Sequence, residues 1–250
     1  MNQSAVLVTG GSRGIGAEIV RALAKRNVPV CFNYLSGAEA AKALAGELEA
    51  QGHKYCLVQA DVADPQSVER MFAEATQALG PLGGLVNNAC FVGKAGRKVE
   101  NLDYETLRKT FDVNVIGAFL CAQQAVRHMA TSSGGKGGRI INVSSIAART
   151  GSPNDWVDYA ASKAAMDALT LGLARETAQQ GIRVTGVAPA GVATDLHANA
   201  GAPERVERFS HITPIGRAAH PGEIADVVLW ALLDAPDYLT SSTIEVTGGL

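Results

Sequence analysis

Tyr159 and Lys163 are two side chains whose types and spacing suit joint acid–base chemistry. They are four residues apart near the expected start of a helix, so both side chains lie on one helix face. A free tyrosine has a pKa of about 10, which is poorly matched to proton transfer at neutral pH. A lysine ammonium group close to the phenol favours the phenolate. The spacing therefore predicts a tyrosine whose pKa is lowered by Lys163.

A glycine-rich loop lies far upstream of this pair, between the first apolar run and the first helical segment. It reads Thr9-Gly10-Gly11-Ser12-Arg13-Gly14-Ile15-Gly16. Glycine permits positive φ and close backbone approach, and the N-terminus of the following helix offers unpaired N–H groups to a pyrophosphate. The position of the loop after the first strand of an alternating fold favours a dinucleotide site over an ordinary turn. The spacing is GxxxGxG and not GxGxxG.

Together these motifs resemble the short-chain dehydrogenase/reductase family over nearly all of the 250 residues. TGxxxGxG is the dinucleotide loop of that family, and Tyr159 with Lys163 completes its YxxxK motif. The other landmarks that match in order are Asp61-Val62, Asn87-Asn88-Ala89, Asn114, Ser144-Ser145, and Pro189 with Thr194. Each motif alone is weak, but their order and their secondary-structure context are specific.

The resemblance implies four catalytic residues, Asn114, Ser145, Tyr159 and Lys163. Tyr159 is expected to pass a proton to or from the substrate oxygen, and Lys163 to hold the nicotinamide ribose. Ser145 is expected to polarise the carbonyl, since a hydroxyl donates without becoming charged, with Ser144 as its structural neighbour. Asn114 matches the asparagine that interrupts its helix and holds a water in a proton relay. The implied reaction is hydride transfer between C4 of a nicotinamide and a carbonyl carbon.

The residues expected to contact the cofactor follow the predicted strands or belong to the catalytic pair. They are Gly10, Ser12, Arg13, Gly14, Ile15, Gly16, Asn33, Tyr34, Asp61, Val62, Asn88, Ala89, Tyr159, Lys163, Pro189, Val192 and Thr194.

NADP(H) is favoured over NAD(H) by the charges after the second apolar run. An acidic residue about 20 positions beyond the first glycine would bind a ribose 2′-hydroxyl and repel a 2′-phosphate. The sequence has no acidic residue there before Glu39. Arg13 is expected to reach the same corner, and Asn33 and Ser36 are neutral donors. NAD(H) stays possible.

Two positions depart from the family pattern. Cys90 and Ala190 stand where the family usually has glycine. Cys90 adds a side chain beside the nicotinamide region, and Ala190 narrows the backbone freedom of its turn. Each substitution is either harmless, or trims the pocket, or tunes cofactor affinity.

Apolar runs alternate with helical segments along the chain. Strands are expected at 5–9, 28–34, 55–58, 85–86, 139–143, 182–187 and 243–246, and helices at about 17–26, 37–51, 64–79, 102–129, 158–181 and 223–233. Runs buried on both faces and separated by helices predict a parallel sheet with helices on each side. The expected fold is a single doubly wound, Rossmann-like α/β domain over residues 1–250, with about seven strands.

Composition excludes several classes of protein. The chain is 47% hydrophobic and 18% charged, which is enough apolar material for a sizeable core. Its 22 basic and 24 acidic residues are interleaved, so no nucleic-acid partner is expected. No apolar stretch approaches about 18 residues and no leader is recognised, so we expect a cytoplasmic protein without a membrane span. The spacing of the four cysteines and five histidines predicts free thiols and no metal site.

The substrate is the least determined feature. Residues 91–101 and 190–213 are expected to form the pocket rim and a mobile lid, with Asp155 and Trp156 also facing the pocket. Such a mixture of side chains leaves ketones, sugars and acyl thioesters open.

The leading hypothesis is an NADP(H)-dependent carbonyl reductase or alcohol dehydrogenase acting on a small molecule. Two alternatives are an NAD-dependent sugar or alcohol dehydrogenase and a non-catalytic dinucleotide-binding regulator. The resemblance also implies a homotetramer. The apolar segment 224–233 is compatible with an interface in it, and equally with core packing.

Overall fold

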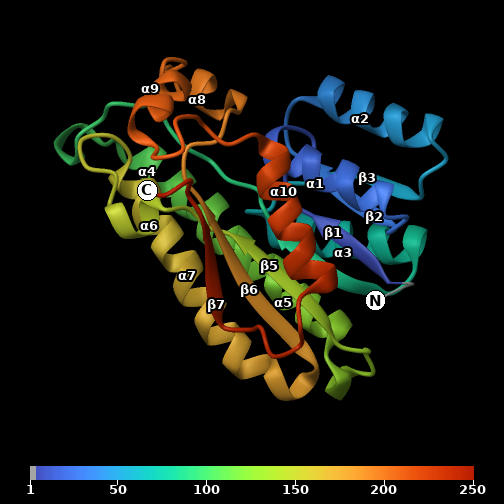
Figure 1. Ribbon diagram of the computed structural model, residues 1–250. Helices are drawn as coiled ribbons and strands as arrows, with labels where there is room; N and C mark the ends of the chain where they lie inside the picture. The colour runs from blue at the N-terminus through green and yellow to red at the C-terminus, as the bar shows by residue number, and fades with distance from the viewer. Residues whose placement is uncertain (1–3) are drawn as a thin grey trace.

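The computed structural model describes residues 4–250, so residues 1–3 of the predicted domain lie outside the described part of the chain. Its centre is a seven-stranded sheet, every neighbouring pair of which is parallel, in the order β3-β2-β1-β4-β5-β6-β7 (Figure 1). The prediction of a doubly wound sheet with about seven strands is confirmed. The strands are β1 Ala5–Val8, β2 Val30–Tyr34, β3 Tyr55–Gln59, β4 Leu82–Asn87, β5 Gly138–Val143, β6 Ile182–Pro189 and β7 Ser242–Val246.

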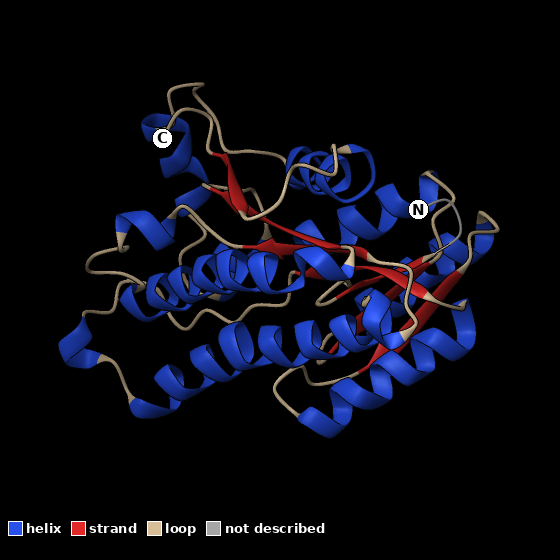
Figure 2. Ribbon diagram, turned by 90° about the horizontal axis from the view of Figure 1, so that it is seen from below, coloured by secondary structure: helices blue, strands red, loops and turns tan. Residues whose placement is uncertain are grey.

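Helices cover both faces of the sheet (Figure 2). One face carries α1 Gly14–Lys25, α2 Ala38–Ala50 and α10 Pro221–Leu229, and the other carries α3 Pro65–Leu79, α5 Gly117–Met129 and α7 Val157–Thr177. The shorter helices α4 Tyr104–Phe111, α6 Ala147–Thr150, α8 Asp195–Asn199 and α9 Arg205–Ile212 belong to the connections. In Figure 1, α8 and α9 lie at the top of the molecule, clear of the two helical layers.

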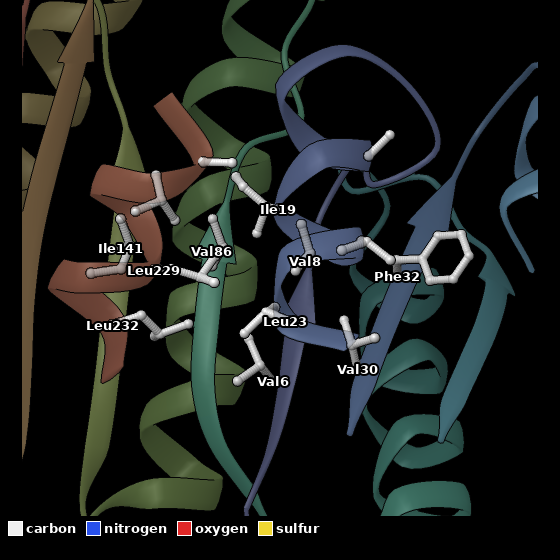
Figure 3. Close-up of a cluster of buried hydrophobic side chains, with 14 of the residues drawn as sticks. Val6, Val8, Ile19, Leu23, Val30, Phe32, Val86, Ile141, Leu229 and Leu232 are labelled. Carbon is white, nitrogen blue, oxygen red and sulfur yellow. The ribbon is translucent and has the colours of Figure 1, made fainter. Parts of the chain in front are cut away.

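The core is divided by the sheet into two layers. Figure 3 shows the layer between β1, α1 and α10, where Val6, Ile19, Leu23 and Leu232 pack with at most 1% of each residue exposed. Because both faces of the sheet are covered, every residue of β1 is buried. This explains why the strands read as continuous apolar runs and not as alternating ones.

Local signals set several helix boundaries. The Asp64 carboxylate accepts hydrogen bonds from the backbone N–H groups of Gln66 and Ser67 at 3.3 and 3.1 Å, and Pro65 begins α3 as predicted. The last predicted helix starts earlier than expected, at Pro221, because the side chain of Glu223 accepts from the backbone N–H of His220 at 2.8 Å.

The helix predicted over 102–129 is interrupted. It begins at Tyr104, after the capping residue Asp103, and contains a π-helical turn over Asp112–Ile116 before α5 continues. This turn includes Asn114, the position at which the family resemblance places a helix interruption. Within residues 4–250, no helix is long and apolar enough to cross a membrane.

Candidate active site

The glycine loop between β1 and α1 is packed tightly against the turn after β4. Gly10 and Gly14 have φ of +63° and +55°, which favour glycine. A Cβ at Gly10 would lie 2.9 Å from the Cα of Ala89, and one at Gly16 would meet the carbonyl of Gly10 and the side-chain amide of Asn88. The glycines therefore permit both the backbone conformation and the close approach of the two turns.

Two asparagines hold this loop in place. The amide of Asn88 donates to the carbonyls of Thr9 and Gly10 at 2.9 and 3.1 Å. Asn33 accepts from the backbone N–H of Gly10 at 2.9 Å and donates to the carbonyl of Ala60 at 2.8 Å. Only 2% of Asn33 is exposed, so its side chain supports the loop from below, and its predicted contact with the cofactor stays a prediction. Asn88 likewise has its side chain turned into the loop.

Arg13 differs from its neighbours because its side chain is exposed at the start of α1. It forms no ion pair with any other residue of 4–250. In the adjoining groove, Arg21 pairs with both Glu18 and Glu47 at 2.8 Å and neutralises acidic charge there. Within residues 4–250, Arg13 is therefore the arginine of this groove that has no ion-pair partner, and the carboxylate of Asp195 lines the groove as well.

A second loop, after β6, faces the glycine loop. Pro189 is the last residue of β6, and Val192 forms an isolated parallel β-bridge with Ala219. Thr194 begins α8, and its Cγ2 lies 3.4 Å from the position a Cβ would take on Gly14. The first and last predicted cofactor-contacting segments are thus neighbours in space.

The remaining predicted cofactor residues lie at the end of β2, at the start of α1 and directly after β3. Tyr34 is half-buried at the end of β2, and Ile15 packs against the core beneath the loop. The carboxylate of Asp61 accepts from the backbone N–H of Ala63 at 2.9 Å. Val62 packs against Gly117, since a Cβ added to Gly117 would lie 2.8 Å from Cγ2 of Val62.

The two residues of the YxxxK motif lie on α7, beside the end of β5. The Lys163 ammonium group donates to the carbonyl of Val143 at 2.7 Å and lies 5.6 Å from the ring centroid of Tyr159. The hydroxyl of Ser144 donates to the carbonyl of Lys163 at 3.2 Å and is buried. Ser145, and not Ser144, is the serine whose hydroxyl lies close enough to Tyr159 to influence the pKa of the phenol.

Burial dominates the electrostatics of Tyr159. Burial raises the pKa of Tyr159 well above its ordinary value, the nearby Cys90 adds to the rise, and the Ser145 hydroxyl opposes it. Burial also lowers the pKa of Lys163. Lys163 is not among the groups that shift the pKa of Tyr159 in this structure, so the lowering of that pKa by the ammonium group stays a prediction. Tyr159 is protonated at neutral pH.

The side chain of Asn114 fastens the π-helical turn to the pocket rim. Its carbonyl oxygen accepts from the backbone N–H of Phe91 at 2.7 Å, and its amide donates to the Phe91 carbonyl at 2.9 Å and to the hydroxyl of Ser162 at 3.0 Å. The Ser162 hydroxyl in turn donates to the carbonyl of Tyr159 at 2.7 Å. Because these bonds use both N–H groups of the amide, the side chain of Asn114 holds the rim and α7 together, and its part in a proton relay stays a prediction.

Sequence reasoning missed a buried ion pair beside Tyr159. The guanidinium group of Arg97, in the rim, donates to both carboxylate oxygens of Asp158 at 2.7 and 2.6 Å, and the hydroxyl of Thr110 lies 2.9 Å from the same carboxylate. Asp158 is 4% exposed. The signal was an acidic residue directly before the tyrosine, but its partner lies 61 residues away and no local pattern identifies it.

A polar ladder through the sheet was also missed. The amide of Asn87 donates to the side-chain oxygen of Asn142 at 3.0 Å, and the amide of Asn142 donates to the hydroxyl of Thr170 at 2.9 Å. These three buried residues connect β4, β5 and α7. They fix the helix that carries Tyr159 and Lys163 against the sheet.

A sequence model of the family described as short chain dehydrogenase matches residues 4–205. The chain belongs to the short-chain dehydrogenase family. Among curated members, the uncharacterized oxidoreductase YgfF of Escherichia coli strain K12 is 44% identical over 243 residues, which cover 97% of this chain and 98% of YgfF.

Two solved structures are similar to this chain over nearly its whole length. A blue fluorescent protein from a metagenomic library in complex with NADPH is 35% identical, with a TM-score of 0.86 over 98% of this chain and 97% of its own. A short chain dehydrogenase from Burkholderia cenocepacia J2315 in complex with NADP is 32% identical, with a TM-score of 0.88 over 99% of this chain and 97% of its own.

The two departures from the short-chain dehydrogenase pattern both lie at this site. Cys90 is a half-buried free thiol close enough to Tyr159 and Lys163 to raise the pKa of each. The backbone N–H of Ala190 donates to the carbonyl of Val246 at 3.1 Å, so its turn is part of the sheet edge. No group of three His, Cys, Asp or Glu side chains within residues 4–250 is arranged to hold a metal ion.

Proposed function

We propose that this short-chain dehydrogenase is an NADP(H)-dependent oxidoreductase that interconverts a carbonyl compound and a secondary alcohol. The observation that carries the proposal is Tyr159, which is partly buried, has a raised pKa that keeps it protonated at neutral pH, and lies close to the Ser145 hydroxyl. A protonated phenol held beside a second hydroxyl donor suits the delivery of a proton to a carbonyl oxygen that gains charge. This arrangement favours the reductive direction.

The residues at the glycine loop fit a dinucleotide. A side chain at Gly10 or Gly16 would clash with the neighbouring turn, and the N-terminus of α1 presents backbone N–H groups beside the unpaired charge of Arg13. Arg13 supports a 2′-phosphate, as do the neighbouring structures with NADPH and NADP. When bound, the cofactor supplies a hydride to the carbonyl carbon.

The chain's own residues divide the remaining work. Ser145 would hold the carbonyl oxygen, and Tyr159 would donate its proton to that oxygen as the alcohol forms. Lys163, held by the Val143 carbonyl on one side, would bind the nicotinamide ribose on the other. Asn114 would keep the rim next to the tyrosine through its bonds to Phe91.

The test is an assay in which the protein is mixed with NADPH, and then with NADH, and with a panel of ketones, sugars and acyl thioesters. Oxidation of the cofactor is measured as the loss of its near-ultraviolet absorbance. We expect oxidation of NADPH that falls by about 100- to 10,000-fold in Tyr159→Phe, whereas NADPH binding is retained. Tyr238→Phe is the matched control, since Tyr238 is fully exposed in the loop before β7.

Other outcomes of the same assay would favour the alternatives. Tight NADH binding with negligible NADPH binding would support an NAD-dependent sugar or alcohol dehydrogenase. Tight NADPH binding without turnover of any compound would support a dinucleotide-binding regulator.

Self-association and location complete the proposal. The apolar segment 224–233 is mostly buried, whereas exposed apolar side chains gather on α4, the π-helical turn and α5, namely Tyr104, Leu107, Ile116 and Phe119. We infer that the α4–α5 surface forms the interface of a homotetramer, and light scattering of the purified protein tests whether the tetramer forms.

The four free thiols favour a reducing compartment such as the cytoplasm.

A further inference from the structure

A cluster of charged and aromatic side chains joins the lid to the helix of Tyr159. The lid is defined here as residues 190–213 and contains α8 and α9. Arg205 of α9 forms an ion pair with Asp155, in the loop before α7. Its guanidinium carbon also lies 4.0 Å from the ring centroid of Trp156. Both charged side chains are 17% exposed, so the pair is largely removed from solvent.

Trp156 connects this ion pair to Tyr159. Their ring centroids are 6.1 Å apart with an interplanar angle of 65°, an edge-on contact. On the lid side, the ring of His197 stacks on the ring of Trp156, with a centroid distance of 6.0 Å and an interplanar angle of 14°. The ring centroid of Phe209 lies 5.6 Å from that of His197. Aromatic contacts therefore run without a break from α9 to Tyr159.

The same two residues also hold the rim. The Asp155 carboxylate accepts from the backbone N–H of Gly96 at 2.9 Å, and the indole N–H of Trp156 donates to the carbonyl of Lys94 at 3.3 Å. Trp156 is only 3% exposed. The lid, the rim and α7 thus meet at Asp155 and Trp156, and Arg205 is the lid's charged contact there.

The lid is also seated on the turn after β6. A Cβ at Gly191 would overlap the ring of Phe209, so glycine is needed for the ring to lie there. This turn includes Ala190 and leads to the predicted cofactor residues Val192 and Thr194. Movement of α9 would therefore change both the substrate side and the cofactor side of the site.

We propose that Arg205 is a positioning residue that holds the lid over Tyr159 by pairing with Asp155 and stacking on Trp156. A planar guanidinium can make both contacts at once, whereas the ammonium group of lysine supplies only a point charge. Without Arg205, the carboxylate of Asp155 loses its cation and the indole of Trp156 loses the group that covers it. The lid is then released, and Trp156 no longer fixes the ring of Tyr159.

This inference rests on the proposed function only for its kinetic part. In Arg205→Ala, we expect kcat/KM for the best carbonyl substrate to fall by about 10- to 100-fold, mostly through KM. In Arg205→Lys, the ion pair is kept and the stack is lost, so the loss is smaller but clear. Arg208→Ala is the matched control, because Arg208 is an exposed arginine of the same helix, and it should behave as the parent protein does.

A second readout needs no activity. The chain has two tryptophans, and in a Trp230→Phe background the fluorescence reports on Trp156 alone. We expect its emission to shift to longer wavelength in Arg205→Ala, and hydrogen exchange of α8 and α9 to accelerate while that of α3 is unchanged. Asp155→Asn approaches the same contact from the other side and should produce the same shift.

The outcomes separate the two proposals. Unchanged emission, unchanged exchange and parental KM in both Arg205→Ala and Asp155→Asn would overturn the positioning role. Absence of NADPH oxidation in the parent protein would defeat the proposed function, yet fluorescence and exchange would still decide whether Arg205 holds the lid. A variant that fails to fold is recognised by exchange throughout the chain, and Arg205→Lys then carries the test.

Discussion

At the scale of single residues, the site depends on which charges are buried and which are free. Lys163 is buried and Tyr159 is partly buried, and desolvation shifts their pKa values in opposite directions, up for the phenol and down for the ammonium group. Arg13, in contrast, remains exposed without an ion pair in residues 4–250. Each of these states has a measurable consequence.

The pH dependence of reduction follows from the raised pKa of Tyr159. A general acid works below its pKa, so the protonated phenol persists through neutral pH. We expect kcat for carbonyl reduction to be flat there and to fall only above the ordinary tyrosine pKa of about 10. A decline in kcat that begins near neutral pH would show that the phenol ionises early and would contradict the burial argument.

Cofactor preference is expected to depend on Arg13. A charge-assisted hydrogen bond to a 2′-phosphate contributes about 1.5–3 kcal/mol, so Arg13→Ala should weaken NADPH binding by about 10- to 100-fold. NADH lacks that phosphate, and its affinity should be unchanged. Calorimetry with both cofactors measures this, with Arg127→Ala, an exposed arginine of α5, as the control. Equal effects on NADPH and NADH would remove the assignment.

At the scale of elements, the site is assembled by contacts between helix ends and loops. The π-helical turn at Asn114 is joined to the rim, the rim to α7, and α7 to the lid. Most of these contacts involve a short connection or the first turn of α7, while the rest of the long helices provides a rigid frame. A change in one loop is therefore expected to alter its neighbours without unfolding the sheet.

The lid is expected to be sensitive to acid through His197. Burial and then the charge of Arg205 lower the pKa of His197, and Asp155 partly opposes this. A lowered folded-state pKa means that the stability from neutral His197 is present above the unfolded value of about 6.5 and is lost as pH falls toward the folded value. As the pH falls below the unfolded-state pKa toward the folded-state pKa of His197, hydrogen exchange of α8 and α9 should accelerate.

Removal of Arg205 gives the matching test. Arg205→Ala removes the positive charge that helps to lower the pKa of His197, so this pKa should rise toward its ordinary value. An NMR titration, with the His197 signal identified by its loss in His197→Gln, measures the shift. An unchanged or lower pKa would show that Arg205 does not face His197 in solution.

At the scale of the whole molecule, a sheet covered on both faces makes the two core layers the main source of stability. Leu23 of α1 is fully buried between the helix and the sheet. Leu23→Ala should reduce the free energy of unfolding by about 2–5 kcal/mol through lost apolar contacts and a residual cavity. Leu35→Ala is the control, since Leu35 is 51% exposed and should change stability little. Denaturant unfolding compares the two variants, and equal losses would be inconsistent with the described core.

Much of this architecture is determined by local sequence. The apolar runs, the glycine loop, the capping by Asp64 and the spacing of Tyr159 and Lys163 each act within a few residues, so composition and periodicity identify them. The parallel sheet with helices on both faces follows from the same alternation, whereas the order of the strands comes from the structure. The motifs also identify the family and the candidate site residues before any coordinate is known.

Tertiary structure alone decided how those residues behave. Burial raises the pKa of Tyr159, which the spacing of the motif did not indicate, and folding places the side chain of Asn33 beneath Gly10, where it supports the glycine loop. Arg205 and Asp155 meet across 50 residues of sequence. Desolvation and ion pairing depend on atoms brought together by folding, and their energies are not encoded in any short segment of the chain.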